Sequence, residues 1–261
     1  MKPDPSRALR VFIGIILAWL VLAFSAKADP GAISIVFIGD SITHGAGTPQ
    51  PATQAAPVVC GQLLQQQLPG TTVAVFNQGY VGFTALGISK HMPGIEKEVA
   101  TFFAAHPGRP VFSIMLGTND SANSGPAGCP TAAADYRNYL KAIVDEILAK
   151  YPDVKIFLQR PIFYSANTRK KGADYSGPTA ADRLKSYFPE ITGLVADYAA
   201  SHPHQVTEGD TKAYDYFAAH YQAELAPEHG LDGTFYLHPN ATGAASLGKF
   251  WADAMAPNLG P

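Results

Sequence analysis

A candidate nucleophile lies in residues 39–43, Gly-Asp-Ser-Ile-Thr, directly after a short apolar run. A serine that follows a strand and precedes a helix presents its hydroxyl group at the end of a sheet, which suits a nucleophile. The same Gly-Asp-Ser tripeptide is also typical of an ordinary turn in which Ser41 caps a helix. The segment therefore nominates Ser41 but needs support from the rest of the chain.

Two further loops carry groups that can bind a developing negative charge. Residues 77–84 read Asn-Gln-Gly-Tyr-Val-Gly-Phe-Thr, and residues 117–120 read Gly-Thr-Asn-Asp. Glycine lets a backbone N–H group approach a ligand, and the Asn119 amide is a side-chain donor, so the two loops can form an oxyanion hole. Each loop alone fits an ordinary turn. Asp40 and Asp120 are interpreted as acceptors that organise the loops.

His238 is the candidate general base, because it lies in a loop immediately before the last predicted helix. His44 is close to Ser41 in sequence and ranks second, whereas the other six histidines fit surface or capping positions. His202 and His204 have no third ligand at the spacing of a zinc site. We therefore expect no metal and no cofactor.

The pattern along the chain predicts an α/β fold, because short β-branched runs alternate with longer helical stretches. We expect strands at residues 33–38, 72–76, 110–116, 154–159 and 205–207. We expect helices at residues 57–68, 94–105, 132–150, 180–200, 212–224 and 241–256. Ligands of such parallel sheets bind beyond the carboxyl ends of the strands, and the candidate loops follow three consecutive strands.

Residues 1–28 have the features of a signal peptide. Lys2, Arg7 and Arg10 precede an apolar run at residues 11–24, and Ala-Lys-Ala at residues 26–28 fits a cleavage site. The run is shorter than the about 20 residues that span a bilayer, so cleavage is favoured over an uncleaved tether. We expect residues 29–261 to form one exported domain, periplasmic or extracellular, with no stable membrane insertion.

Composition limits the partners of the chain. The 261 residues are 47% hydrophobic and 15% charged, which indicates one globular core. The net charge of −2 becomes about −5 when the signal peptide is removed, so the basic patch that nucleic acid needs is missing. We expect a monomer that binds a small-molecule or polysaccharide ester.

The two cysteines, Cys60 and Cys129, both lie in the predicted mature chain. An oxidising compartment permits a disulfide bond between them, which would stabilise the fold by about 3–4.5 kcal/mol. The alternative is two buried free thiols. We slightly favour the disulfide.

These motifs, in this order, resemble those of the SGNH or GDSL superfamily of serine esterases and lipases. The resemblance runs from about Ile33 to the last helix. It implies a flavodoxin-like three-layer α/β/α sandwich with Ser41 as nucleophile and His238 as base. It also implies an oxyanion hole made by the N–H groups of Ser41 and Gly82 and by the Asn119 amide. Gly82 is preferred over Gly79 because the glycine of the family lies five residues beyond an asparagine such as Asn77.

One position departs from the family pattern. Members usually carry an aspartate three residues before the histidine, and Phe235 stands there. Asp232 is the nearest acid, and a looped-out insertion of three residues would return it to the imidazole, so Asp232 is the predicted third catalytic residue. The alternative is a Ser-His dyad in which a backbone carbonyl or another acid, such as Glu228 or Asp210, orients the ring.

The resemblance and the predicted export together favour a carboxylesterase or acetylesterase that cleaves O-acetyl esters of carbohydrates. Tyr80, Phe83 and Tyr164 are candidate substrate-binding aromatics, although each also fits ordinary packing. One alternative is a lysophospholipase or a general short-chain carboxylesterase. Another is a secreted binding module that keeps the fold without the chemistry.

Overall fold

The computed structural model describes residues 31–260, so the predicted signal peptide lies outside the described residues. Its centre is a parallel sheet in the order β2-β1-β3-β4-β7. The strands are β1 (Ala32–Gly39), β2 (Thr72–Gly79), β3 (Arg109–Met115), β4 (Lys155–Gln159) and β7 (Val206–Glu208). Every strand predicted from the sequence is confirmed to within three residues at each end.

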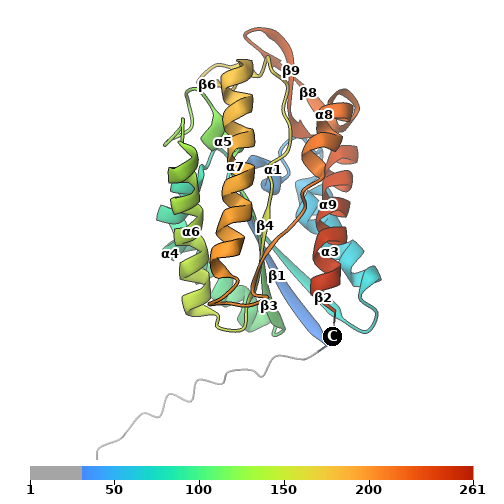
Figure 1. Cartoon of the computed structure of the whole chain (residues 1–261). Helices are drawn as coiled ribbons and strands as arrows, with labels where there is room; N and C mark the ends of the chain where they lie inside the picture. Colours follow the sequence, from blue (N-terminus) through green and yellow to red (C-terminus); the bar gives the residue numbers. More distant parts are fainter. Residues whose placement is uncertain (1–30, 261) are drawn as a thin grey trace, which may run out of the picture.

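Each face of the sheet is covered by helices, which gives three layers (Figure 1). One face packs against α4 (Ala85–Ala105), α6 (Ala133–Lys150) and α7 (Gly177–Tyr198). The other packs against α3 (Ala56–Gln67), α8 (Ala213–Glu224) and α9 (Ala241–Met255), which a short 3₁₀ turn, η1 (Ala256–Asn258), extends. The predicted α/β/α sandwich is confirmed.

Alternation along β1 explains why its sequence is apolar throughout. Val36 and Ile38 pack toward α4 and α6, whereas Ile33, Ile35 and Phe37 pack toward α3 and α9. A strand that is buried on both faces has no polar face to alternate with. β1 is therefore an interior strand of the sheet, with β2 and β3 as its neighbours.

The order of the strands determines where a ligand can bind. The chain passes from β1 to β2 on one side and then returns to place β3 on the other side of β1. At such a reversal the loops after β1 and β3 diverge and leave a crevice at the carboxyl edge of the sheet. Two short helices follow these strands, α1 (Ser41–His44) after β1 and α5 (Thr118–Ser121) after β3. A third short helix, α2 (Pro51–Gln54), precedes α3.

Two β-hairpins that were not predicted lie at the same end of the molecule (Figure 1). They are formed by β5 (Arg169–Lys170) with β6 (Ala173–Asp174), and by β8 (Leu225–Gly230) with β9 (Gly233–Pro239). The N–H group of Leu231 donates to the carbonyl of Arg169, which joins the two hairpins. The carboxyl edge of the main sheet is thus bordered by a small antiparallel layer.

Two other predictions are wrong in detail. α4 begins at Ala85 rather than at Gly94, because Thr84 caps it by accepting a hydrogen bond from the Gly87 N–H group. The favoured disulfide is also wrong. Cys60 on α3 is buried on one side of the sheet, Cys129 packs against the hydrophobic cluster on the other side, and both are free thiols.

Within residues 31–260, no helix is both long and apolar enough to cross a bilayer.

Candidate active site

Ser41 is the first residue of α1, directly beyond the end of β1. Asp40 caps this helix, because its Oδ1 accepts a hydrogen bond of 2.9 Å from the Ile42 N–H group. Gly39 brings the turn close to β3, where an added Cβ would lie 2.7 Å from the carbonyl oxygen of Met115. The N–H group of Ser41 belongs to the first turn of a helix, where N–H groups have no partner within the helix.

His238 reaches Ser41 from the opposite end of the chain. It lies near the end of β9, and Asn240 then caps α9 by accepting a 3.0 Å hydrogen bond from the Gly243 N–H group. Nε2 of His238 is 2.9 Å from Oγ of Ser41, although 197 residues separate them. The structure therefore brings together the predicted nucleophile and the predicted base.

Glu228 on β8 is the acid that contacts His238. Its Oε1 lies 2.8 Å from Nδ1 of the ring and 3.4 Å from the backbone nitrogen of His238. Burial raises the pKa of Glu228, but the hydrogen bond and charge of His238, together with Lys170, outweigh burial and leave that pKa below its ordinary value. A carboxylate beside Nδ1 accepts a hydrogen bond from Nδ1–H, so the ring carries its hydrogen on Nδ1. Nε2 is then free to accept a hydrogen bond from the hydroxyl group of Ser41.

The structure corrects the prediction that Asp232 meets the imidazole. Asp232 lies in the two-residue turn of the hairpin, its side chain is 47% exposed, and Oδ2 is 3.7 Å from a guanidinium nitrogen of Arg169. Strand pairing closes the hairpin at Gly230 and Gly233, which leaves Asp232 at the tip while His238 lies near its base. Asp210, also considered, instead accepts hydrogen bonds from Lys212 and Ala213 at the start of α8.

The predicted oxyanion donors on two different loops are joined through Phe83. The N–H group of Phe83 donates to the carbonyl of Tyr80, which closes a turn whose third residue, Gly82, has φ of 80°. The carbonyl of Phe83 accepts a 2.8 Å hydrogen bond from Nδ2 of Asn119 on α5. Asn119 thus lies beside the turn that carries the Gly82 N–H group.

Gly79 and Gly82 have different structural roles. An added Cβ at Gly79 would lie 2.2 Å from the backbone nitrogen of His44, so only glycine lets β2 approach α1 this closely. At Gly82 an added Cβ would meet nothing within 4 Å, and the positive φ is what favours glycine there. Asn77 strengthens the contact with α1 by donating a 2.9 Å hydrogen bond to the carbonyl of Thr43.

Asp40 and Asp120 organise the loops, as predicted. Both carboxylate oxygens of Asp120 accept from the N–H group of Ala85 at the start of α4, at 3.0 and 3.1 Å. Burial raises the pKa of Asp40 to about 6 and that of Asp120 to about 7, against the opposing effect of these backbone hydrogen bonds. The charge of Asp40 also contributes to the raised pKa of Asp120.

The three aromatic residues proposed for substrate binding lie in different environments. Tyr80 and Phe83 are half-buried, have ring centroids 5.3 Å apart, and both contact the ring of His91 on α4. Tyr164 is buried in the core, and its hydroxyl group is 2.8 Å from Oγ of Ser121. Tyr164 therefore packs in the core, about as buried as Asn119, and its contact with substrate stays a prediction.

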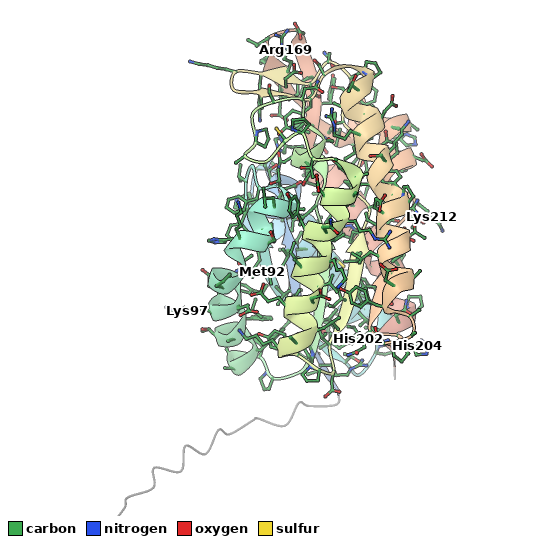
Figure 2. All side chains as sticks on the ribbon, turned by 60° about the vertical axis from the view of Figure 1, so that its left-hand side comes forward. Met92, Lys97, Arg169, His202, His204 and Lys212 are labelled. Carbon is green, nitrogen blue, oxygen red and sulfur yellow. The ribbon has the colours of Figure 1, made fainter. Side chains whose placement is uncertain are left out.

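Among residues 31–260, no group of three or more His, Cys, Asp or Glu side chains is arranged to hold a metal ion. Figure 2 shows His202 and His204 at the end of the molecule opposite Arg169. Arg169 belongs to the β5–β6 hairpin beside the hairpin that carries His238. These two histidines are therefore remote from Ser41.

Comparison with solved structures supports the fold. The chain is 20% identical to an acetylxylan esterase from Geobacillus stearothermophilus, over 89% of this chain and 95% of that one, with a TM-score of 0.57. It is 18% identical to a carbohydrate acetylesterase from Sinorhizobium meliloti, over 86% and 98%, with a TM-score of 0.55. An aryl esterase from M. smegmatis is 17% identical, over 84% and 96%, with a TM-score of 0.55.

Comparison of the sequence with curated proteins gives no match. The model of the GDSL-like lipase/acylhydrolase family, in contrast, matches residues 37–245, which include the candidate catalytic side chains and all of the sheet except the first part of β1. Together with the Ser41–His238 contact, this match means that the chain belongs to the GDSL-like lipase/acylhydrolase family of ester-hydrolysing enzymes.

Proposed function

We propose that this protein is an exported serine esterase that removes O-acyl groups, in particular O-acetyl groups, from carbohydrates. The observation that carries the mechanism is the continuous contact from Oγ of Ser41 through the His238 ring to Oε1 of Glu228, with distances of 2.9 and 2.8 Å. Such a relay activates a serine hydroxyl group for attack on a carbonyl carbon.

In the first step, Oγ of Ser41 attacks the ester carbonyl while Nε2 of His238 takes the hydroxyl proton. Glu228 accepts a hydrogen bond from the Nδ1–H group and stabilises the imidazolium that forms. The negative charge on the carbonyl oxygen is bound by the N–H groups of Ser41 and Gly82 and by the Asn119 amide. His238 then gives its proton to the leaving alcohol, which departs and leaves the acyl group on Ser41.

In the second step, water hydrolyses the acyl-enzyme. His238 takes a proton from the water as its oxygen attacks the acyl carbon, and the same donors bind the oxyanion. Collapse of this intermediate breaks the bond to Oγ of Ser41, which recovers the proton from His238. The carboxylic acid leaves, and the enzyme returns to its starting protonation state.

Three observations support a carbohydrate substrate. Two structural neighbours are a carbohydrate acetylesterase and an acetylxylan esterase. The predicted signal peptide would bring the enzyme to polysaccharides outside the cytoplasm. The loop that follows α5 also exposes only short side chains, at Ser124, Ala127, Pro130 and two glycines, which favours access for a bulky alcohol.

The test is acetate release from acetylated xylan, measured beside aryl acetate and longer aryl esters. The matched control is Ser41→Ala, whose melting temperature shows whether it is folded. We expect acetate release from the polysaccharide that disappears in the variant. Activity on aryl or long-chain esters alone would favour the short-chain carboxylesterase or the lysophospholipase. A folded protein that fails to react with a fluorophosphonate would instead favour the binding module.

Export needs its own experiment. Expression of the full chain in a bacterium, followed by N-terminal sequencing, should give a mature protein that begins at Asp29 and is recovered outside the cytoplasm. A chain that keeps Met1 and sediments with membranes would favour the uncleaved tether.

A further inference from the structure

The orientation of the Asn119 amide is determined by its two partners. The Phe83 carbonyl oxygen can only accept, so the amide group 2.8 Å from it is Nδ2. Oδ1 therefore points the other way, where it accepts a 2.6 Å hydrogen bond from the hydroxyl group of Tyr175. Nδ2 has two hydrogens, and the Phe83 carbonyl takes one of them. The second remains for the oxyanion of the substrate.

We propose that Tyr175 is a positioning residue of the ester-hydrolysis reaction, which holds the Asn119 amide with its donor toward the oxyanion. The proposal rests on the proposed function, because it needs Asn119 to bind the oxyanion. Tyr175 itself does not have to touch the substrate.

Tyr175 is held rigidly enough for this role. It directly follows β6, its N–H group donates to the carbonyl of Thr168 at 2.9 Å, and its side chain is buried. Its ring packs edge-on against that of Tyr164, with centroids 5.7 Å apart. Burial also raises the pKa of the Tyr175 hydroxyl, so it stays protonated and remains a donor.

Other buried tyrosines near this loop make a different kind of contact. The hydroxyl group of Tyr136 donates to the carbonyl of Leu116, and that of Tyr187 donates to the carbonyl of Thr131. Those hydrogen bonds hold the main chain. Tyr175 instead contacts the side-chain amide that acts on the substrate.

Two effects make this hydrogen bond relevant to the rate. A donor at Oδ1 polarises the amide and strengthens its N–H groups as donors. It also disfavours rotation of the amide by half a turn, which would place Oδ1 against the Phe83 carbonyl and turn a lone pair toward the oxyanion. Both effects act mainly in the transition state, when the charge on the carbonyl oxygen is greatest. The expected consequence is a change in kcat rather than in KM.

The experiment compares four proteins on a short aryl ester: wild type, Tyr175→Phe, Asn119→Ala and the double variant. Tyr175→Phe removes one hydrogen bond to Asn119, so we expect its kcat to fall about tenfold, with KM changed by less than about twofold. In the Asn119→Ala background, Tyr175→Phe should have no further effect, because its target is gone. The rate of fluorophosphonate labelling of Ser41 should follow the same pattern.

The matched control is Tyr187→Phe, which removes a buried hydroxyl group from the same cluster but leaves Asn119 untouched. Its kcat should equal that of wild type. All variants are assayed well below the lowest melting temperature in the set, so that a loss of folded protein does not imitate a loss of rate. An equal loss in both backgrounds would mean that Tyr175 acts through the fold, and an unchanged kcat in Tyr175→Phe would also overturn the proposal. Wild type without turnover on any ester would overturn the proposed function as well.

Discussion

Oε1 of Glu228 lies 2.8 Å from Nδ1 of His238, across a hairpin that pairs β8 with β9. The acid precedes the base by ten residues and stands on the neighbouring strand. In most family members the acid lies three residues before the histidine, and the short segment between them positions it. In this protein, the pairing of β8 with β9 positions Glu228 instead. Phe235, at the position where the family usually has aspartate, is buried in the core.

Glu228→Gln should lower kcat strongly. The amide is close in size to the carboxylate, but it carries no charge to stabilise the imidazolium and offers a donor where Nδ1 needs an acceptor. We expect a loss on the order of 10³–10⁴ in kcat. The control is Asp232→Asn, which we expect to retain wild-type kcat because Asp232 is at the hairpin tip. If Asp232→Asn lost most of its activity while Glu228→Gln kept it, the assignment of the acid would be reversed.

Asn119→Ala should impair turnover while leaving the protein folded. Removal of one oxyanion donor costs on the order of 10²–10³ in kcat, with a smaller effect on KM. Steady-state kinetics on a short aryl ester measure both constants, and a thermal melt checks the fold. An unchanged kcat would refute the role of Asn119.

The central sheet could be predicted because burial on both faces leaves a clear pattern in the sequence. β1 and β3 are continuous apolar runs, and each ends at a loop with glycine and small polar residues. Since parallel strands place their carboxyl ends at one edge, the positions of Ser41 and Asn119 followed from the strands. The choice of His238 followed from its position before the last helix and from the family resemblance.

Glu228 was predicted only as an alternative to Asp232, because its hairpin has weak strand signals. β8 reads Leu-Ala-Pro-Glu-His-Gly, with a proline and no β-branched residue, and pairs with β9 alone. The turn signal was present as glycines at positions 230 and 233, with the two residues Leu231 and Asp232 between them. Read as a hairpin, that spacing would have placed Asp232 at the tip and left Glu228 as the acid able to reach the ring.

Gly79→Ala should damage both stability and catalysis. The added Cβ would lie 2.2 Å from the His44 backbone nitrogen, so α1, which begins with Ser41, must shift. We expect destabilisation of about 1–3 kcal/mol in urea unfolding and a clear fall in kcat. Gly94→Ala on α4 is the control, since neither Gly79 nor Gly94 has a positive φ and an added Cβ at Gly94 comes no closer than 3.4 Å to a neighbouring side chain. Equal effects of the two changes would mean that the loss of glycine itself, rather than the contact with α1, decides the outcome.

Asp120 should make a contribution to stability that falls as the pH rises from about 4 to about 8. Burial raises the pKa of Asp120 to about 7, above its value near 3.9 in an unfolded chain. A raised pKa in the folded state gives stability that is fully present below the unfolded value and is lost as the pH rises through the folded value. The loss from this group is at most about 4 kcal/mol.

Asp120→Asn removes this titration. The free energy of unfolding of the variant, taken relative to that of wild type, should therefore rise from acidic to alkaline pH. Asp182→Asn, at an exposed position on α7, should leave the slope as it is in wild type. Urea unfolding across this pH range measures the three slopes, and parallel curves for wild type and Asp120→Asn would show that Asp120 is ionised throughout.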